Sequence, residues 1–242
     1  MPKLAPLLAA LFSLLLVSCA HDQPPAPTTQ AAPQAETSPA QPAWYEPEIQ
    51  AFETADRTNP PAPGQVLFIG SSSIRMWKSL ADDMAPAPVL NRGFGGSKTP
   101  EVLAVMDRIV SPYDPAVIVY YCGDNDLGDN NTDSRAAADG FIDFAKRVHK
   151  RRPLTPILYL SIKPSIARWS NWDAMDRANH MVADYAATHR NVEFIDVGAC
   201  LLKDGAPDPA LFRADGLHLN ADGYARWTEI VRPRVLAAWR RR

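Results

Sequence analysis

Cysteine is scarce in this chain, with three residues in 242, which is too few for a framework of disulfide bonds. An excess of charge of one sign is also missing, since 25 basic residues stand against 27 acidic ones. Nucleic-acid binding normally needs a basic face, so we expect no nucleic-acid partner. Histidine occurs only five times, and none stands with carboxylates at metal-ligand spacing. We therefore expect no metal and no other cofactor.

An apolar run long enough to span a membrane is missing at the N-terminus. Lys3 is followed by an apolar segment from Leu4 to Val17, whereas a transmembrane helix needs roughly 20 apolar residues. A basic start, a short apolar segment and small residues after it are typical of a secretory signal peptide. The sequence therefore predicts a signal peptide over residues 1–18.

The segment Leu16-Val17-Ser18-Cys19 resembles the lipobox of bacterial lipoproteins. The resemblance implies that Cys19 carries the lipid and attaches the protein to the membrane of the cell envelope. The alternative is an ordinary signal peptide with an incidental cysteine. Residues 19–43 are rich in Pro, Ala, Gln and Thr, and such a segment serves as an extended tether. Because Ala20 rather than aspartate follows Cys19, the analogy favours the outer membrane, facing the periplasm.

Residues 44–242 are long enough for one α/β domain. Short apolar runs predict strands over 66–70, 88–91, 116–121, 156–160 and 192–196. Helical patterns cover 73–80, 100–110, 134–151, 172–189 and 221–239, with a bend near Pro233 in the last. Strands that alternate with helices at crossover spacing predict a three-layer α/β/α sandwich around a five-stranded parallel sheet. Its ligands bind at the carboxyl ends of the strands.

Unusual polar segments follow three of these strands and precede the last helix: Gly70–Ser73, Asn91–Gly96, Gly123–Asp126 and Asp215–His218. A serine nucleophile needs a neighbouring base and donors for the developing oxyanion. Ser72 stands where a strand becomes a helix, and Asp215 is close enough in sequence to orient His218. These residue types together predict acyl-transfer chemistry.

The same segments resemble the four blocks of the SGNH hydrolases, also called the GDSL lipase/esterase family. Their order and spacing match from Phe68 to Gly223. The resemblance implies a flavodoxin-like fold. It assigns the catalytic residues as Ser72, Asp215 and His218, and the oxyanion donors as the backbone N–H groups of Ser72 and Gly96 and the side chain of Asn125.

One position departs from the family pattern, because Ser71 replaces the aspartate of Gly-Asp-Ser and leaves three consecutive serines. The spacing from Gly70 selects Ser72 as the nucleophile. We assign Ser71 and Ser73 to capping and turn hydrogen bonds. The role of Asp124 stays open at this point.

The expected activity is hydrolysis of a small acyl ester through an acyl-enzyme, as in an esterase, a lysophospholipase or an O-acetylesterase. The alternatives are transfer or removal of O-acetyl groups on an envelope polysaccharide, and a catalytically silent envelope binding protein. Trp169 and Trp172 are candidates for a pocket wall, for core packing or for a lid. Cys122 and Cys200 are expected to be free thiols, with a bridge as the alternative.

Overall fold

The computed structural model describes residues 43–128 and 133–241. The predicted signal peptide, most of the predicted tether and Cys19 lie outside the described residues. Within the described part of the chain, no helix is both long enough and apolar enough to cross a membrane.

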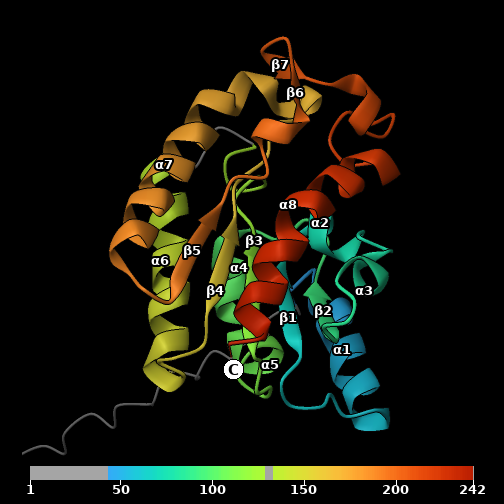
Figure 1. Ribbon diagram of the computed structural model, residues 1–242, viewed down its shortest axis with the longest axis vertical. Coiled ribbons are helices and arrows are strands. Elements are labelled where there is room, and N and C mark those ends of the chain that lie inside the picture. Colours follow the sequence, from blue (N-terminus) through green and yellow to red (C-terminus); the bar gives the residue numbers. More distant parts are fainter. Residues whose placement is uncertain (1–42, 129–132, 242) are drawn as a thin grey trace, which may run out of the picture. The chain divides into compact units, whose positions relative to one another are not determined.

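A five-stranded parallel sheet forms the centre of the described domain (Figure 1). Its strands are β1 (Val66–Gly70), β2 (Val89–Gly93), β3 (Val117–Tyr121), β4 (Ile157–Leu160) and β5 (Val192–Ile195). They lie in the order β2-β1-β3-β4-β5, and every neighbouring pair is parallel. The predicted five-stranded parallel sheet is therefore confirmed, and β2 extends two residues past its predicted end.

Side chains alternate between two apolar cores, one on each face of the sheet. Leu67 and Ile69 of β1 belong to one core, and Phe68 between them belongs to the other. The same alternation continues in β3, where Tyr120 and Tyr121 point to opposite faces. Because both faces are covered, the strands consist of continuous apolar runs rather than alternating polar and apolar residues.

Helices cover both faces and complete the predicted three layers (Figure 1). The first core is closed by α1 (Glu46–Thr58), α4 (Thr99–Ala104), α5 (Met106–Ile109), α6 (Ser134–Arg151) and α7 (Trp172–Thr188). The second is closed by α2 (Ser72–Arg75), α3 (Leu80–Asp83) and α8 (Ala221–Trp239). Pro233 lies inside α8, which continues to Trp239.

Two predicted helices are each divided in the structure. The helix expected over 73–80 ends at Arg75, and a second one starts at Leu80, because Trp77 turns into the core and donates from Nε1 to Asp83 Oδ2 at 2.6 Å. The helix expected over 100–110 is interrupted at Val105, whose φ of −107° and ψ of 8° are not helical. Thus, both corrections concern internal breaks rather than the presence of helical structure.

Helix α1 was not predicted. Its sequence is mostly polar, and Ile49 is its only fully buried residue, so the apolar periodicity that marks a packed helix is weak. Besides Ile49, polar contacts hold the helix, because Arg108 of α5 binds Glu46 at 2.7 Å and Glu53 at 2.6 Å, and Asp56 binds Arg92.

Short elements surround the second half of the sheet. They are the 3₁₀ helices η1 (Ile166–Asn171), η2 (Ala199–Leu201) and η3 (Pro209–Leu211) and the antiparallel strands β6 (Leu202–Lys203) and β7 (Ala206–Pro207). After η3, Phe212 and Leu219 form an isolated antiparallel bridge. This bridge closes the loop that contains Asp215 and His218.

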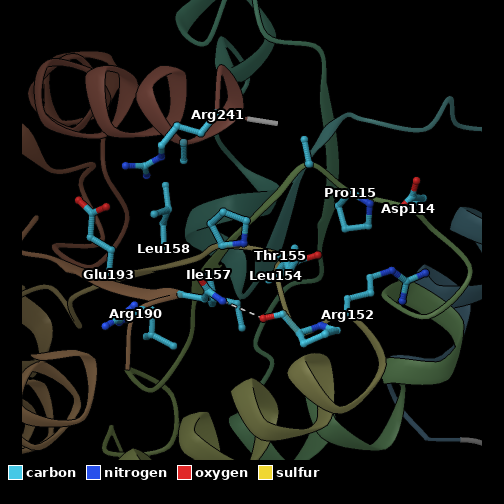
Figure 2. Close-up of a pocket in the computed structure, with 16 residues that line it drawn as sticks. Asp114, Pro115, Arg152, Leu154, Thr155, Ile157, Leu158, Arg190, Glu193 and Arg241 are labelled. Carbon is cyan, nitrogen blue, oxygen red and sulfur yellow. Dashed lines mark hydrogen bonds between the residues drawn. The ribbon is translucent and has the colours of Figure 1, made fainter. Parts of the chain in front are cut away.

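A cavity of about 740 Å³ lies at the amino ends of β4 and β5. Figure 2 shows Arg152, Arg190 and Arg241 around it, together with Leu154 and Glu193. Ser72, Asp215 and His218 do not line this cavity, because they lie at the carboxyl ends of the strands. The cavity is therefore separate from the predicted site.

Candidate active site

The turn after β1 fixes the position of Ser72. Gly70 has a φ of +145°, and an added Cβ would come within 1.8 Å of the Tyr121 carbonyl oxygen, so only glycine fits there. Ser71 N–H donates to the same carbonyl at 3.1 Å, and α2 begins at Ser72. The first N–H groups of a helix have no intrahelical acceptor, so that of Ser72 is available at this edge.

The three consecutive serines differ in what they contact. Ser72 Oγ lies 3.0 Å from His218 Nε2. Ser71 is fully buried, and its hydroxyl donates to Asp124 Oδ1 at 3.4 Å. Ser73 is also buried, and its carbonyl accepts from the Tyr224 hydroxyl. Of the three, Ser72 is the one that the structure brings to the histidine.

The loop closed by Phe212 and Leu219 holds the base. Asp215 Oδ1 accepts two backbone hydrogen bonds, from Leu217 N–H and His218 N–H, each at 2.9 Å. These bonds leave Asp215 Oδ2 directed at the His218 ring, where it lies 2.7 Å from Nδ1. A four-residue segment thus positions both the carboxylate and the imidazole.

The proton positions in this group follow from its charges. The hydrogen bond from the His218 ring holds the pKa of the Asp215 carboxyl well below its usual range, and the backbone N–H groups of His218 and Leu217 lower it further. An ionised carboxylate only accepts, so Nδ1 of the neutral ring carries the proton and Nε2 accepts from the Ser72 hydroxyl. A hydroxyl, an imidazole and a carboxylate in this order can activate the hydroxyl as a nucleophile.

Gly96 lies in a loop that α1 holds from one side. Its φ is +72°, and an added Cβ would lie 3.3 Å from the Trp44 ring. The neighbouring Gly95 N–H donates to Glu48 Oε1 at 3.3 Å, and Arg75 Nη1 contacts the same oxygen at 3.3 Å. Arg75 therefore pairs with α1.

The Asn125 side chain is held at both ends of its amide. Asn125 Nδ2 donates to the Ser97 carbonyl at 3.0 Å, and Arg168 Nη2 donates to Asn125 Oδ1 at 2.9 Å. Because Ser97 follows Gly96 directly, the first bond ties the two predicted oxyanion donors to one another. All five residues predicted for catalysis and oxyanion binding thus come from the segments at the carboxyl edge of the sheet.

A buried pair of charges lies behind Asn125. Lys163 Nζ is 3.4 Å from Asp124 Oδ2, and both side chains are almost completely buried. Arg168 Nη1 lies 3.5 Å from the same oxygen. Burial favours a higher pKa for Asp124, but the charges of Lys163 and Arg168 outweigh it, so that the pKa lies below its usual value. This answers the question that the sequence left open about Asp124.

Three of these residues were missed from the sequence: Glu48, Lys163 and Arg168. Glu48 and Arg168 resemble ordinary surface charges in the sequence. Lys163 carried a usable signal, because it lies in the segment just after the buried strand β4 and lysine is almost never fully buried without a partner. Ser71 carried another, because the missing aspartate suggests a carboxylate supplied from elsewhere.

Two exposed indole rings belong to segments that contact the site. Trp44, 57% exposed, lies against Gly96, and Trp169 is 36% exposed and stacks on Trp172. The segment that carries Trp169 is tied to the base loop, since Ala167 N–H donates to the Gly216 carbonyl at 3.0 Å. Trp44 thus lies beside a predicted oxyanion donor, and the segment of Trp169 adjoins the base loop.

The described ranges contain no cluster of metal-binding side chains, and their two cysteines are not bridged. Within residues 43–128 and 133–241, no group of three or more His, Cys, Asp and Glu side chains is arranged to hold a metal ion. Cys122 and Cys200 are both free thiols, and they pack on opposite faces of the sheet. Burial raises the pKa of the Cys122 thiol well above its usual value.

The three-layer α/β/α fold, together with a serine, a histidine and a carboxylate in mutual contact, indicates a hydrolase. The chain belongs to the GDSL-like lipase/acylhydrolase family, whose model matches residues 69–226. The matched range includes every residue of the site that the sequence analysis assigned. No curated protein matches the chain.

Solved structures of several bacterial proteins share the fold. One is a candidate acylhydrolase from Bacteroides fragilis, with a TM-score of 0.71 and 19% identity over 82% of this chain and 100% of that one. A GDSL-like lipase from Bacteroides thetaiotaomicron has a TM-score of 0.67 and 17% identity over 78% and 98%. An acetyl-xylooligosaccharide esterase from Geobacillus has a TM-score of 0.55 and 18% identity over 70% and 93%. At these identities the likeness concerns the fold alone.

Proposed function

We propose that this hydrolase cleaves small acyl esters through a covalent acyl-enzyme on Ser72. The observation that carries the proposal is the continuous chain of contacts from Ser72 Oγ through the His218 ring to Asp215, at 3.0 and 2.7 Å. Each contact is within the range that proton transfer to a positioned base requires. The family's lipases and acylhydrolases perform chemistry of this class.

The first half of the reaction forms the acyl-enzyme. Ser72 Oγ attacks the ester carbonyl carbon while His218 Nε2 takes the hydroxyl proton, and the Asp215 carboxylate stabilises the resulting imidazolium. His218 then returns this proton to the leaving alkoxide, the C–O bond breaks, and the alcohol departs. The acyl group remains bonded to Ser72.

The second half releases the acid. A water molecule loses a proton to His218 Nε2 and attacks the acyl carbon, and the bond to Ser72 Oγ then breaks as that oxygen recovers the proton. In both halves the carbonyl oxygen becomes negative. The proposed donors to it are Ser72 N–H, Gly96 N–H and Asn125 Nδ2, each contributing about 3 kcal/mol to the barrier reduction.

Exposed Trp44 and Trp169 favour an acylated carbohydrate as a second candidate substrate. The Trp44 ring lies against Gly96, and Trp169 is exposed on the segment that contacts the base loop. Such flat apolar faces are ones against which the C–H groups of a sugar ring can pack. An acetyl-xylooligosaccharide esterase is among the solved structures that share the fold. Deacetylation of such a glycan uses the same acyl-enzyme, whereas transfer replaces the water with a second hydroxyl group.

Hydrolysis of p-nitrophenyl acetate and butyrate tests the proposal. We expect turnover by the wild type, loss of turnover in Ser72→Ala, and retained turnover in Ser71→Ala and Ser73→Ala if these variants fold. A fluorophosphonate probe should label the wild type and not Ser72→Ala. No labelling of a folded wild-type protein would instead favour a catalytically silent binding protein. Acetylated glycans and lysophospholipids, compared at equal concentration, separate the two substrate classes.

We also propose a bacterial envelope location, with a lipid anchor on Cys19 and the domain facing the periplasm. The support is the lipobox-like segment Leu16–Cys19 and the tether composition after it. Growth with radiolabelled palmitate tests it. We expect label in the wild-type protein, recovered with the outer membrane, and neither label nor membrane recovery in Cys19→Ala. Label-free wild-type protein in the soluble periplasmic fraction would contradict it.

A further inference from the structure

A side-chain amide serves as an oxyanion donor only in one of its two orientations. The oxygen and nitrogen ends of asparagine are similar in size, and only the nitrogen end carries protons. A rotation of 180° would turn a carbonyl oxygen toward the developing negative charge. A site that uses Asn125 therefore needs a reason for the amide to keep its nitrogen directed at the substrate.

The contacts of Asn125 supply this reason. Its nitrogen end faces the Ser97 carbonyl, which can only accept, and its oxygen end faces the Arg168 guanidinium, which can only donate. In the flipped amide, Oδ1 would face the Ser97 carbonyl, so that two acceptors would meet. At the other end, Nδ2 would face the Arg168 guanidinium, so that two donors would meet. The observed orientation uses one Nδ2 proton for Ser97 and leaves the second for a ligand.

Arg168 is itself held from the Asp124 side. Its Nη1 donates to the Asp124 carbonyl at 2.7 Å and lies 3.5 Å from Asp124 Oδ2. One guanidinium fork thus spans the backbone of one residue and the side chain of the next. Lysine could not reproduce this arrangement, because it has a single ammonium rather than two rigidly spaced donors.

The buried carboxylate of Asp124 anchors this arrangement from below. It lies between Lys163 Nζ at 3.4 Å, Arg168, and the Ser71 hydroxyl at 3.4 Å. Ser71 occupies the position where the family pattern has an aspartate. The carboxylate beside the nucleophile turn is therefore that of Asp124, the neighbour of Asn125. The same carboxylate pairs with Arg168, which contacts Asn125.

We propose that Arg168 is a positioning residue, which holds the Asn125 amide in the orientation that donates to the oxyanion. Arg168 acts through Asn125 and contacts no reacting atom. The inference rests on the proposed function, since it presumes that Asn125 stabilises an oxyanion formed at Ser72.

A double-mutant cycle on the full chain tests it. We measure kcat and KM with p-nitrophenyl acetate for the wild type, Arg168→Ala, Asn125→Ala and the double variant. In the wild-type background, Arg168→Ala should lower kcat by about 10- to 100-fold and change KM by less than about threefold. In the Asn125→Ala background, the same substitution should change kcat by less than about threefold, because the amide that it positions is absent.

Matched variants keep the result interpretable. Arg177→Ala removes an exposed arginine from α7, and we expect wild-type kcat. Arg168→Lys should retain the charge yet lower kcat several-fold, and it replaces the alanine variant in the cycle if that variant does not fold. Thermal unfolding of each variant reports folding.

Two outcomes would overturn the inference: an unchanged kcat in folded Arg168→Ala, or an equal loss in both backgrounds, which would indicate a general structural role. Failure of the proposed function is seen separately, as turnover that survives Ser72→Ala.

Discussion

The two halves of the site are built in different ways. The proposed base half consists of Asp215 and His218, three residues apart in one closed loop. The proposed oxyanion half consists of Gly96 and Asn125, which come from different strand ends and depend on contacts from still other segments. Glu48 reaches Gly95 across 47 residues of sequence, and Arg168 reaches Asn125 across 43. One half is thus a local motif, and the other is a product of the tertiary fold.

This difference has a consequence for how each half tolerates change. The base half depends on its own residues and on its loop, which η1 contacts through the hydrogen bond from Ala167 N–H to the Gly216 carbonyl. The oxyanion half can also be weakened at a distance, through Glu48 on α1 or Arg168 on η1, while its two donors remain in place. Substitutions that separate these routes therefore test the comparison.

The base half should show the largest losses. We expect His218→Ala to lower kcat by about 10⁶-fold and Asp215→Asn by about 10⁴-fold, because the imidazole takes the proton itself whereas the carboxylate orients it. The double variant Ser72→Ala/His218→Ala should be no worse than either single variant. Steady-state hydrolysis of p-nitrophenyl acetate checks this, with the concentration of each folded variant measured by absorbance. A His218→Ala variant that keeps a tenth of the wild-type kcat would contradict the role of His218 as the base.

Loss of the oxyanion amide should be severe but smaller. Asn125→Ala should lower kcat by about 10²- to 10³-fold with little change in KM, because the donor acts on charge that develops only in the transition state. Asn125→Asp keeps the shape but offers acceptors, so we expect it to be at least as damaging. A variant that raises KM and leaves kcat unchanged would show that Asn125 binds the ground state instead.

Sequence and structure agree where the information is local. Each strand of the five-stranded sheet was predicted within two residues, because a buried parallel strand is a continuous apolar run with clear ends. Asp215 and His218 were predicted together, because their partnership fits within one short segment. For Ser72, the distance from Gly70 selected the serine that lies beside the histidine.

The parts that could not be predicted depend on distant partners. Helix α1 has one fully buried residue, and its ion pairs with Arg108 and Arg92 join it to distant segments that no local pattern reveals. The contact between Glu48 and Gly95 exists only once α1 has docked. Arg168 has no feature in its own sequence neighbourhood that points to Asn125. These residues hold the oxyanion half, and this is why its support was missed while its donors were assigned.

Removing the contact from α1 should have a moderate effect. Glu48→Ala leaves the Gly95 N–H without its carboxylate acceptor and frees Arg75, so that the Gly96 loop is held less tightly. We expect kcat to fall by about 3- to 10-fold, since small displacements of a donor weaken transition-state contacts. The matched control is Glu229→Ala, which removes a largely exposed glutamate 3.9 Å from Arg226 and should leave kcat unchanged. Equal effects of both variants on kcat would show that the Glu48 contact from α1 does not support the oxyanion half.

The smallest expected effect concerns stability rather than catalysis, and it belongs to the base half. The folded state lowers the pKa of Asp215, so this carboxylate stabilises the fold above the unfolded-state pKa, near 4. That stabilisation declines as the pH falls through the folded-state pKa. It should be at most about 1 kcal/mol, because the side chain is 47% exposed.

Thermal unfolding of the wild type and Asp215→Asn between pH 7 and pH 2 measures this difference. We expect the wild type to be slightly more stable at neutral pH and the gap to narrow progressively below pH 4. A gap that stayed constant down to pH 2 would show that the stabilising contact does not depend on the charge of Asp215. In that case the loop closed by Phe212 and Leu219, rather than the charged hydrogen bonds, would hold the base half together.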